Sequence, residues 1–171
     1  ITNYVSLLKN EQIELHLTEG LTLSIKSPQS ETKMKGINAD EFPLIPKIEQ
    51  PKSIAIPTED LTKAIARTVF ATSQNPAKPV LSGVNFIVDK EQLKVVATDS
   101  YRLAEQKLKL KERAEFDLQS IIPARTVQEL GKVLAKTDEK EVHIEFSQSQ
   151  ILFKLGETEL TSRLIEGSFP A

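Results

Sequence analysis

The eight residues from Ala97 to Ala104 carry the side chains best placed to do chemistry in this chain. A carboxylate and a hydroxyl are adjacent at Asp99 and Ser100, as in some nucleophile and aspartyl-protease turns. However, no glycine follows to shape such a loop, and no base has a recognisable place beside it. Aspartate is also a common turn residue, because its carboxylate accepts hydrogen bonds from nearby backbone N–H groups. We therefore predict that Asp99 is a turn residue without a catalytic role.

Other catalytic chemistries have little support in the composition. The two histidines, His16 and His143, fall on the polar phase of strand-like segments and are too isolated for a metal site. The chain has no cysteine, which excludes disulfides and thiolate chemistry. Its six glycines do not cluster into a phosphate-binding loop. The sequence predicts a protein that is not an enzyme and needs neither a metal nor an organic cofactor.

Charge and hydropathy limit the partners and the location that we expect. A formal charge of −2 argues against a protein that coats nucleic acid with its whole surface, so such contact would need a local basic patch. No apolar run is long enough to span a membrane, and the first residues show no signal-peptide pattern. Together with the absence of cysteine, this indicates a cytoplasmic location without a membrane partner.

The elements that must position the Ala97–Ala104 segment come from a repeat. Apolar and polar residues alternate over 13–25 and again over 142–155, which is typical of antiparallel strands with one buried face. Each block continues into a third extended segment, at 31–35 and at 158–164. Helical tails precede the two blocks, at 5–8 and 127–134. The repeating unit that we predict is a helix followed by three antiparallel strands.

A third copy of this unit lies between the other two. Thr58 is expected to cap a helix whose apolar stripe is formed by Leu61, Ile65 and Val69. Pro123 is suited to open the next helix, because its missing N–H would be unpaired there anyway. The strands expected in this part of the chain are 83–88, 93–97, 102–110 and 116–122. Residues 54–170 are thus predicted to form two strand–helix–three-strand units in one pseudo-symmetric α+β domain.

Four motifs carry a resemblance to a known family. They are Pro79-Val80-Leu81-Ser82-Gly83-Val84, the Ala97–Ala104 segment, Ile121-Ile122-Pro123-Ala124-Arg125-Thr126 and Ser162-Arg163-Leu164-Ile165-Glu166-Gly167-Ser168-Phe169-Pro170. In this order and spacing they resemble the bacterial sliding clamps, the beta subunits of DNA polymerase III. The similarity runs from about Ile54 to the end of the chain and corresponds to the family's middle domain. A weaker match at 36–43 resembles the end of the first domain.

The resemblance implies a DNA-clamp fold, with antiparallel sheets outside and helices inside. In the family, two chains form a homodimeric ring around duplex DNA and tether the polymerase without reading sequence. Such a clamp is a non-catalytic processivity factor of DNA replication. The implied organisation is the C-terminal half of clamp domain 1 at 1–43, a connector at 44–53 and clamp domain 2 at 54–171. Relative to the family, domain 3 is missing, so we interpret the chain as a fragment.

The resemblance also implies a surface that faces DNA. Duplex tracking needs cations on the inner helices, because phosphate attraction does not depend on sequence. The implied DNA-facing residues are Lys63, Arg67, Lys78, Arg125, Lys132 and Lys136. The alternative interpretation of the helix cations is an ordinary solvated face with ion pairs along the helix.

The second implied site is an apolar pocket for short linear peptides of partner proteins. In the family these partners are the polymerase III alpha subunit, the clamp loader and repair polymerases. Position by position, the pocket residues are Leu81, Thr98, Ser100, Tyr101, Arg102, Leu103 and Pro170. Tyr101 replaces a histidine frequent in the family, and Leu81 and Leu103 have core packing as an alternative role. The alternative function is a peptide-binding scaffold of the same fold that does not encircle DNA.

Overall fold

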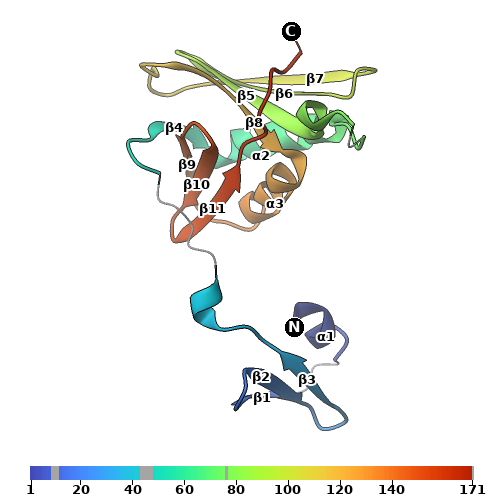
Figure 1. Ribbon diagram of the computed structural model, residues 1–171. Helices are drawn as coiled ribbons and strands as arrows, with labels where there is room; N and C mark the ends of the chain where they lie inside the picture. Colours follow the sequence, from blue (N-terminus) through green and yellow to red (C-terminus); the bar gives the residue numbers. More distant parts are fainter. Residues whose placement is uncertain (9–11, 43–47, 76, 171) are drawn as a thin grey trace. The chain divides into compact units, whose positions relative to one another are not determined.

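The computed structural model describes residues 1–8, 12–42, 48–75 and 77–170. The chain divides into two compact units, Ile1–Pro46 and Lys47–Ala171 (Figure 1). None of the helices in these described segments is both long and apolar enough to cross a membrane.

The first unit is a small antiparallel sheet with a short helix. After α1 (Thr2–Val5) come β1 (Glu14–Thr18), β2 (Thr22–Lys26) and β3 (Glu31–Lys35), paired in the order β1-β2-β3. The helix thus ends at Val5, the first residue of the helical tail predicted over 5–8, and the prediction is wrong for residues 6–8.

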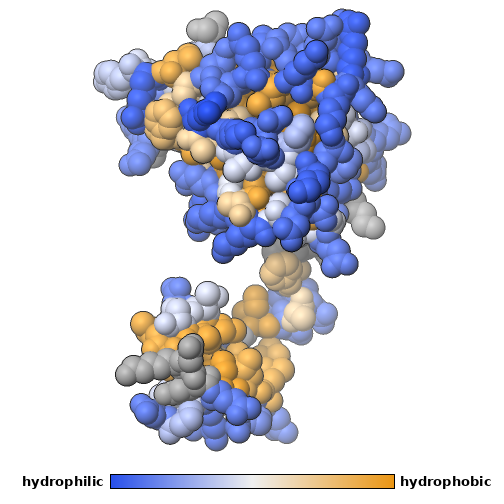
Figure 2. All heavy atoms as spheres, turned by 180° about the vertical axis from the view of Figure 1, so that it is seen from behind, coloured by the Kyte–Doolittle hydropathy of each residue, from blue (hydrophilic) through white to orange (hydrophobic). Residues whose placement is uncertain are grey.

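The prediction that the first strand buries one face is wrong. All of β1 is exposed, with Leu15 at 54% and Leu17 at 72%. The physical reason is that a three-stranded sheet and one short helix provide no second layer among the described residues to cover it. Figure 2 shows the resulting hydrophobic surface on this unit.

The second unit consists of two repeats that share their sheets. The first repeat is β4 (Lys52–Pro57), α2 (Thr58–Thr68), β5 (Gly83–Asp89), β6 (Gln92–Thr98) and β7 (Leu103–Lys109). The second is β8 (Asp117–Pro123), α3 (Ala124–Leu134), β9 (Glu141–Phe146), β10 (Gln150–Leu155) and β11 (Thr158–Arg163). The sheets have the orders β7-β6-β5-β8 and β11-β10-β9-β4, so the leading strand of each repeat joins the sheet of the other repeat. This exchange ties the repeats into one domain.

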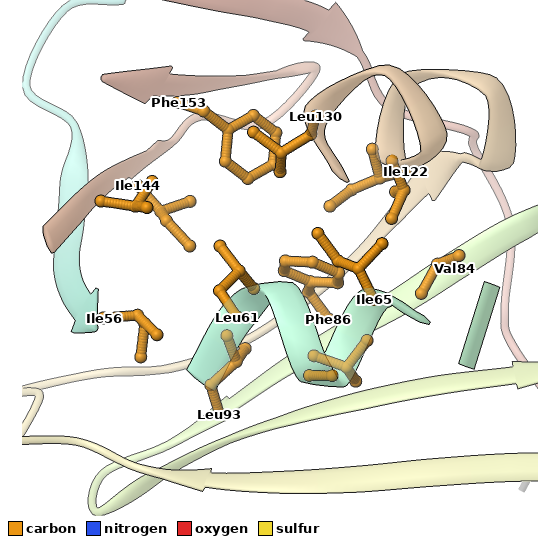
Figure 3. Packing of buried hydrophobic residues seen from close by; sticks show 14 of the residues in the cluster. Ile56, Leu61, Ile65, Val84, Phe86, Leu93, Ile122, Leu130, Ile144 and Phe153 are labelled. Carbon is orange, nitrogen blue, oxygen red and sulfur yellow. The ribbon is translucent and has the colours of Figure 1, made fainter. Parts of the chain in front are cut away.

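The core lies between the two sheets and the helix pair (Figure 3). Leu61 and Ile65 of α2 and Leu130 of α3 point into it, because the apolar stripes of both helices face the sheets. Phe86 of β5 and Phe153 of β10 meet edge to face, with ring centroids 6.3 Å apart. These two fully buried rings therefore join the two sheets across the centre of the domain.

Both predicted helix starts are wrong by one residue. Thr58 is the first residue of α2 and not its cap, a position that Pro57 takes. Thr58 Oγ1 is buried and has no hydrogen-bond partner among the described residues. Pro123 likewise precedes α3, which begins at Ala124. In each repeat the leading strand runs to the proline and the helix begins directly after it, so no polar side chain takes the cap position. The Thr58 N–H instead donates to the Lys140 carbonyl oxygen at 3.0 Å.

Candidate peptide and DNA contact sites

The turn between β6 and β7 is held by its own side chains. Asp99 Oδ1 accepts hydrogen bonds from the backbone N–H of Tyr101 at 3.0 Å and of Arg102 at 3.1 Å. Thr98 Oγ1 donates to the Arg102 carbonyl oxygen at 2.7 Å and accepts from the Ser100 N–H at 3.2 Å. Ser100 has a φ of 79°, the left-handed conformation that such a tight turn requires. The prediction that Asp99 is a turn residue is confirmed.

Arg102 fastens this turn to the segment that follows α2. Its Nε donates to Asp99 Oδ2 at 3.0 Å, and its Nη2 donates to the Phe70 carbonyl oxygen at 2.9 Å. The guanidinium also lies over the Phe70 ring, 5.6 Å from the ring centroid. Two of the guanidinium nitrogens of this predicted pocket residue are therefore already used within the protein, while 58% of the side chain remains exposed.

Phe70 is a candidate site residue that the sequence analysis missed. It lies in the 3-10 turn Val69–Ala71 (η2) directly after α2, and 57% of it is exposed. The signal was an aromatic residue out of phase with the apolar stripe of Leu61 and Ile65. An aromatic side chain that the core does not need is free to form part of a surface site.

The predicted pocket residues differ strongly in exposure. Leu103 begins β7 and is 66% exposed, Tyr101 at the tip of the turn is 97% exposed, and Leu81 is only 6% exposed. Thr98 lies directly opposite Leu103 in the antiparallel register. Leu103 and Tyr101 are two residues apart, and an exposed leucine near an exposed aromatic is the kind of surface that takes up apolar side chains of a partner.

The end of the chain approaches the same region. Phe169 packs against Val96 of β6, and Val80 packs against this small cluster. Pro170 follows Phe169, and Leu81 follows Val80 in the 3-10 turn Pro79–Ser82 (η3). Val80 and Phe169, the neighbours of Leu81 and Pro170 in the sequence, thus meet in one small cluster with Val96 of β6.

The predicted DNA contacts on α2 and α3 belong to adjacent helices. A Cβ added to Gly131 of α3 would lie 3.3 Å from Ile65 Cγ2 of α2, which shows how closely the helices approach. Lys63, Arg67, Arg125, Lys132 and Lys136 all reach solvent. Lys63 pairs with Glu59, and Lys132 Nζ lies 2.9 Å from Glu129 Oε1. The hydrogen bonds from these lysines hold the pKa of both glutamates below their ordinary value.

Lys78 lies beside the β6–β7 turn. Its Nζ is 3.4 Å from Ser100 Oγ. The structure therefore places this predicted DNA contact next to a predicted pocket residue.

Both histidines are exposed, as their polar phase indicates, and among the residues that the structure describes no three His, Asp or Glu side chains gather as metal ligands.

The Asp99 carboxylate is expected to keep its charge to a lower pH than an ordinary aspartate. Hydrogen bonds from the backbone N–H of Tyr101, joined by those from Arg102, lower the pKa of Asp99 below its ordinary value of 3.8. Because the folded pKa is depressed, the charge fully stabilises the folded turn above the ordinary pKa of 3.8. This stabilisation is lost as the pH falls through the folded pKa. An NMR titration of the Asp99 carboxyl carbon should have its midpoint below 3.8.

Two variants separate the causes of this behaviour. Asp99→Asn keeps an oxygen that accepts the backbone N–H groups but loses the charge that pairs with Arg102. We expect its turn resonances to stay native and to be insensitive to pH over the acidic range. Asp99→Ala removes the acceptor as well, so the amide shifts of Tyr101 and Arg102 should move toward disordered values. A midpoint for Asp99 at or above its ordinary pKa would contradict the hydrogen-bonding scheme.

Interlocked strand–helix–three-strand units, with two helices against two antiparallel sheets, define the sliding-clamp class of proteins. Residues 55–171 match the family described as DNA polymerase III beta subunit, central domain. The chain belongs to this family of beta sliding clamps. It is 36% identical to the beta sliding clamp of Staphylococcus epidermidis over 163 residues, 95% of the chain and 43% of that protein.

Solved structures show the same relationship. The DNA polymerase sliding clamp of Bacillus subtilis has 34% identity and a TM-score of 0.82 over 99% of the chain and 45% of that clamp. The DNA polymerase III subunit beta of Pseudomonas aeruginosa has 30% identity and a TM-score of 0.81 over 98% of the chain and 46% of that subunit. The chain therefore spans less than half the length of these relatives, and the resemblance in its sequence motifs is confirmed.

Proposed function

We propose that this chain is part of a sliding clamp, a non-catalytic processivity factor that holds the replicative DNA polymerase on duplex DNA. The observation that carries the proposal is the family match over residues 55–171, on a fold that has two adjacent helices against two sheets. Exposed cations on helices bind phosphates without regard to base sequence, and a protein that slides along DNA needs contacts of this kind. The protein would act in the cytoplasm as a homodimeric ring.

The domain assignment is part of this proposal. Residues 1–43 would be the second half of clamp domain 1, 44–53 a connector and 54–171 clamp domain 2. The exposed apolar face of β1 supports the first assignment, because half of a two-repeat domain leaves its core face uncovered. In the second unit, each repeat completes the sheet of the other, and the first unit has no such partner among its described residues.

The peptide site is the second part of the proposal. Leu103 and Tyr101 would hold the apolar residues of short linear peptides, together with Leu81, Thr98 and Pro170, and Phe70 would support the turn through its contact with Arg102. Partners of this kind are the polymerase III alpha subunit, the clamp loader and repair polymerases. What supports the assignment is the exposure of apolar side chains around a turn that Asp99 and Arg102 keep rigid. A rigid apolar surface loses little entropy on binding.

One observation favours the alternative, a peptide-binding scaffold that does not encircle DNA. Glu59 and Glu129 pair with two of the helix cations and so reduce the positive charge that faces the proposed DNA path. Pairs of this kind along an exposed helix also occur where nothing binds. The two functions differ in whether the helix cations contribute to DNA binding.

Removing the charges of Arg67, Arg125 and Lys132 with glutamine tests this difference. For a clamp, binding of the chain to a short duplex should weaken, and the slope of log K against log salt should decrease by about 0.9 for each phosphate that the variant no longer neutralises. The measurement is a salt series of fluorescence-anisotropy titrations with labelled duplex DNA. Binding of a partner peptide should not change, because the substituted side chains lie outside its site.

A matched control removes three cations from the first unit, with Lys26, Lys33 and Lys35 changed to glutamine. These residues are exposed and belong to β2 and β3. If the control weakens DNA binding as much as the helix variant, the effect is one of net charge and the DNA-facing assignment is wrong. If neither variant changes the salt dependence, the scaffold is the better description.

A further inference from the structure

A second charged surface lies on the sheet that contains the β6–β7 turn, on the face turned away from the core. Leu93 and Leu108 pack into the core, and successive residues of a strand alternate between faces. The lysines next to them, Lys94 and Lys107, therefore lie on the outer face, as does Lys109. A hollow of about 560 Å3 opens there, where β7 nears its end. We call it the basic hollow after its lining cations, Lys90, Lys107, Lys109 and Arg113.

Backbone hydrogen bonds fix the shape of the basic hollow. The Ala114 N–H donates to the Lys90 carbonyl oxygen at 2.7 Å, and the Leu110 N–H donates to the Glu91 carbonyl oxygen at 2.9 Å. Leu110 and Ala114 are themselves buried in the main core. The loop that carries Arg113 is therefore docked onto the β5–β6 turn that carries Lys90. The cations belong to a rigid surface.

The positive charge of this surface is only partly balanced. Lys94 lies directly opposite Lys107 in the β6–β7 register, and like charges in such a pair repel each other. Lys94 Nζ is 3.6 Å from Asp89 Oδ2, and Lys107 Nζ is 3.2 Å from Glu105 Oε1. Both are surface pairs that contribute little. The ion pairs among the described residues include neither Lys109 nor the cations of the two turns. An added anion would relieve this repulsion.

The basic hollow lies on the same face of the sheet as Leu103. Leu103 and Lys109 lie at the two ends of β7 and on the same side of it, since they are an even number of residues apart. At the rise of an extended strand, they are separated by roughly 20 Å. Between them β7 runs as one continuous strand (Figure 1). A peptide anchored at Leu103 and extended along β7 would reach the basic hollow with about six further residues.

We propose that the basic hollow binds an acidic stretch in the partner peptides whose apolar residues occupy the Leu103 site. This inference rests on the proposed function and adds a specificity determinant to it. A polypeptide fits the surface better than nucleic acid does, because the lining residues, all within the described chain, include no aromatic side chain for base stacking. Asp89 and Glu91 also line the hollow and would repel a continuous phosphate backbone. A few carboxylates of an acidic peptide would be enough to pair with the cations of the hollow that have no ion pair among the described residues.

Three labelled peptides test the inference by fluorescence anisotropy with the whole chain. All carry the anchor Gln-Leu-x-Leu-Phe, whose apolar residues are meant for the Leu103 site. The first peptide has no extension, and the second has a six-residue spacer followed by three glutamates. The third has the same spacer followed by three glutamines. Each extension is made on either side of the anchor. The glutamate peptide should bind about three- to tenfold more tightly than the glutamine peptide, as expected for a few exposed ion pairs, and the difference should shrink with salt.

The variant K107Q/K109Q should abolish this difference and leave the affinity of the unextended peptide unchanged. Its matched control is K33Q/K35Q, which removes two exposed lysines at the same spacing on β3. Equal affinity of the glutamate and glutamine peptides for the unmodified chain would overturn the inference, as would an equal loss in the control. Tighter competition for the hollow by oligo(dT) than by the glutamate peptide would also overturn it, in favour of nucleic acid.

Failure of the unextended peptide to bind would count against the proposed function. The inference has a separate readout, an NMR titration with a hexaglutamate peptide alone. We expect the largest shifts at Lys90, Lys107, Lys109 and Arg113, reduced in K107Q/K109Q and retained in K33Q/K35Q. Shifts spread evenly over all exposed lysines would mean that the hollow is not a site.

Discussion

Changing Leu103 to aspartate should abolish peptide binding while leaving the fold intact. Leu103 is 66% exposed at the start of β7, so the folded state loses little when it is replaced. In a complex, burial of a leucine side chain contributes about 1.5–3 kcal/mol, and the variant would in addition have to desolvate a carboxylate. We therefore expect affinity for an anchor peptide to fall by at least about thirtyfold. Fluorescence anisotropy with the labelled peptide measures this directly.

The control for this variant is Leu17→Asp, which places the same charge on another exposed strand leucine. Leu17 lies on β1 and is 72% exposed. Peptide affinity should not change in this variant, and both proteins should keep the native circular dichroism spectrum. If Leu103→Asp bound the peptide as well as the unmodified chain does, the pocket would have to lie elsewhere. A comparable loss in Leu17→Asp would show that the peptide binds apolar surface without selectivity.

Replacing Phe153 with alanine should destabilise the second unit by about 3–5 kcal/mol, the usual cost of removing a core phenylalanine. Phe153 is fully buried and meets Phe86 of the opposite sheet, so its loss leaves a cavity where the two sheets join (Figure 3). Urea unfolding followed by NMR signals of the second unit gives the free energy without a contribution from the first unit. The slope against urea should stay unchanged if only stability is affected.

A double-mutant cycle tests whether the two rings interact beyond filling space. The edge-to-face contact of Phe86 and Phe153 predicts a coupling energy of about 0.5–1.5 kcal/mol. The matched control is Phe70→Ala, which removes an exposed phenylalanine and should change stability by no more than about 1 kcal/mol. Stability changes of similar size for Phe70→Ala and Phe153→Ala would contradict the described core.

Local patterns in the sequence predicted most of the elements of the fold. The alternation over 142–155 gives β9 and β10, because a strand with one buried face needs an apolar residue at every second position. The stripe of Leu61 and Ile65 gives α2 for the corresponding helical reason. The same alternation over 13–25 predicted a buried face on β1, and that prediction failed. Alternation identifies an apolar face of a strand, but the layer that buries this face comes from other parts of a chain.

The contacts of the candidate site were less predictable. Asp99 could be recognised as a turn residue, since the N–H groups that it accepts from lie within three residues of it. Phe70 could not be assigned beside Arg102, because 32 residues separate them and no local pattern encodes such a contact. The proximity of Lys78 to Ser100 has the same origin. The ion pairs within α2 and α3, in contrast, follow directly from helix spacing.

The sequence by itself determined the repeated strand–helix–three-strand units, the turn at Asp99 and the family to which the chain belongs. The units and the turn depend on interactions between residues close in the sequence, and the family assignment depends on the order and spacing of the motifs. Only the tertiary structure decided that β4 pairs with β9 and β8 with β5, which joins the repeats through exchanged strands. It also decided that Phe70 lies against Arg102 and which cations line the basic hollow. Backbone hydrogen bonds between strands are alike for every sequence, so the choice of partner depends on how the whole core packs.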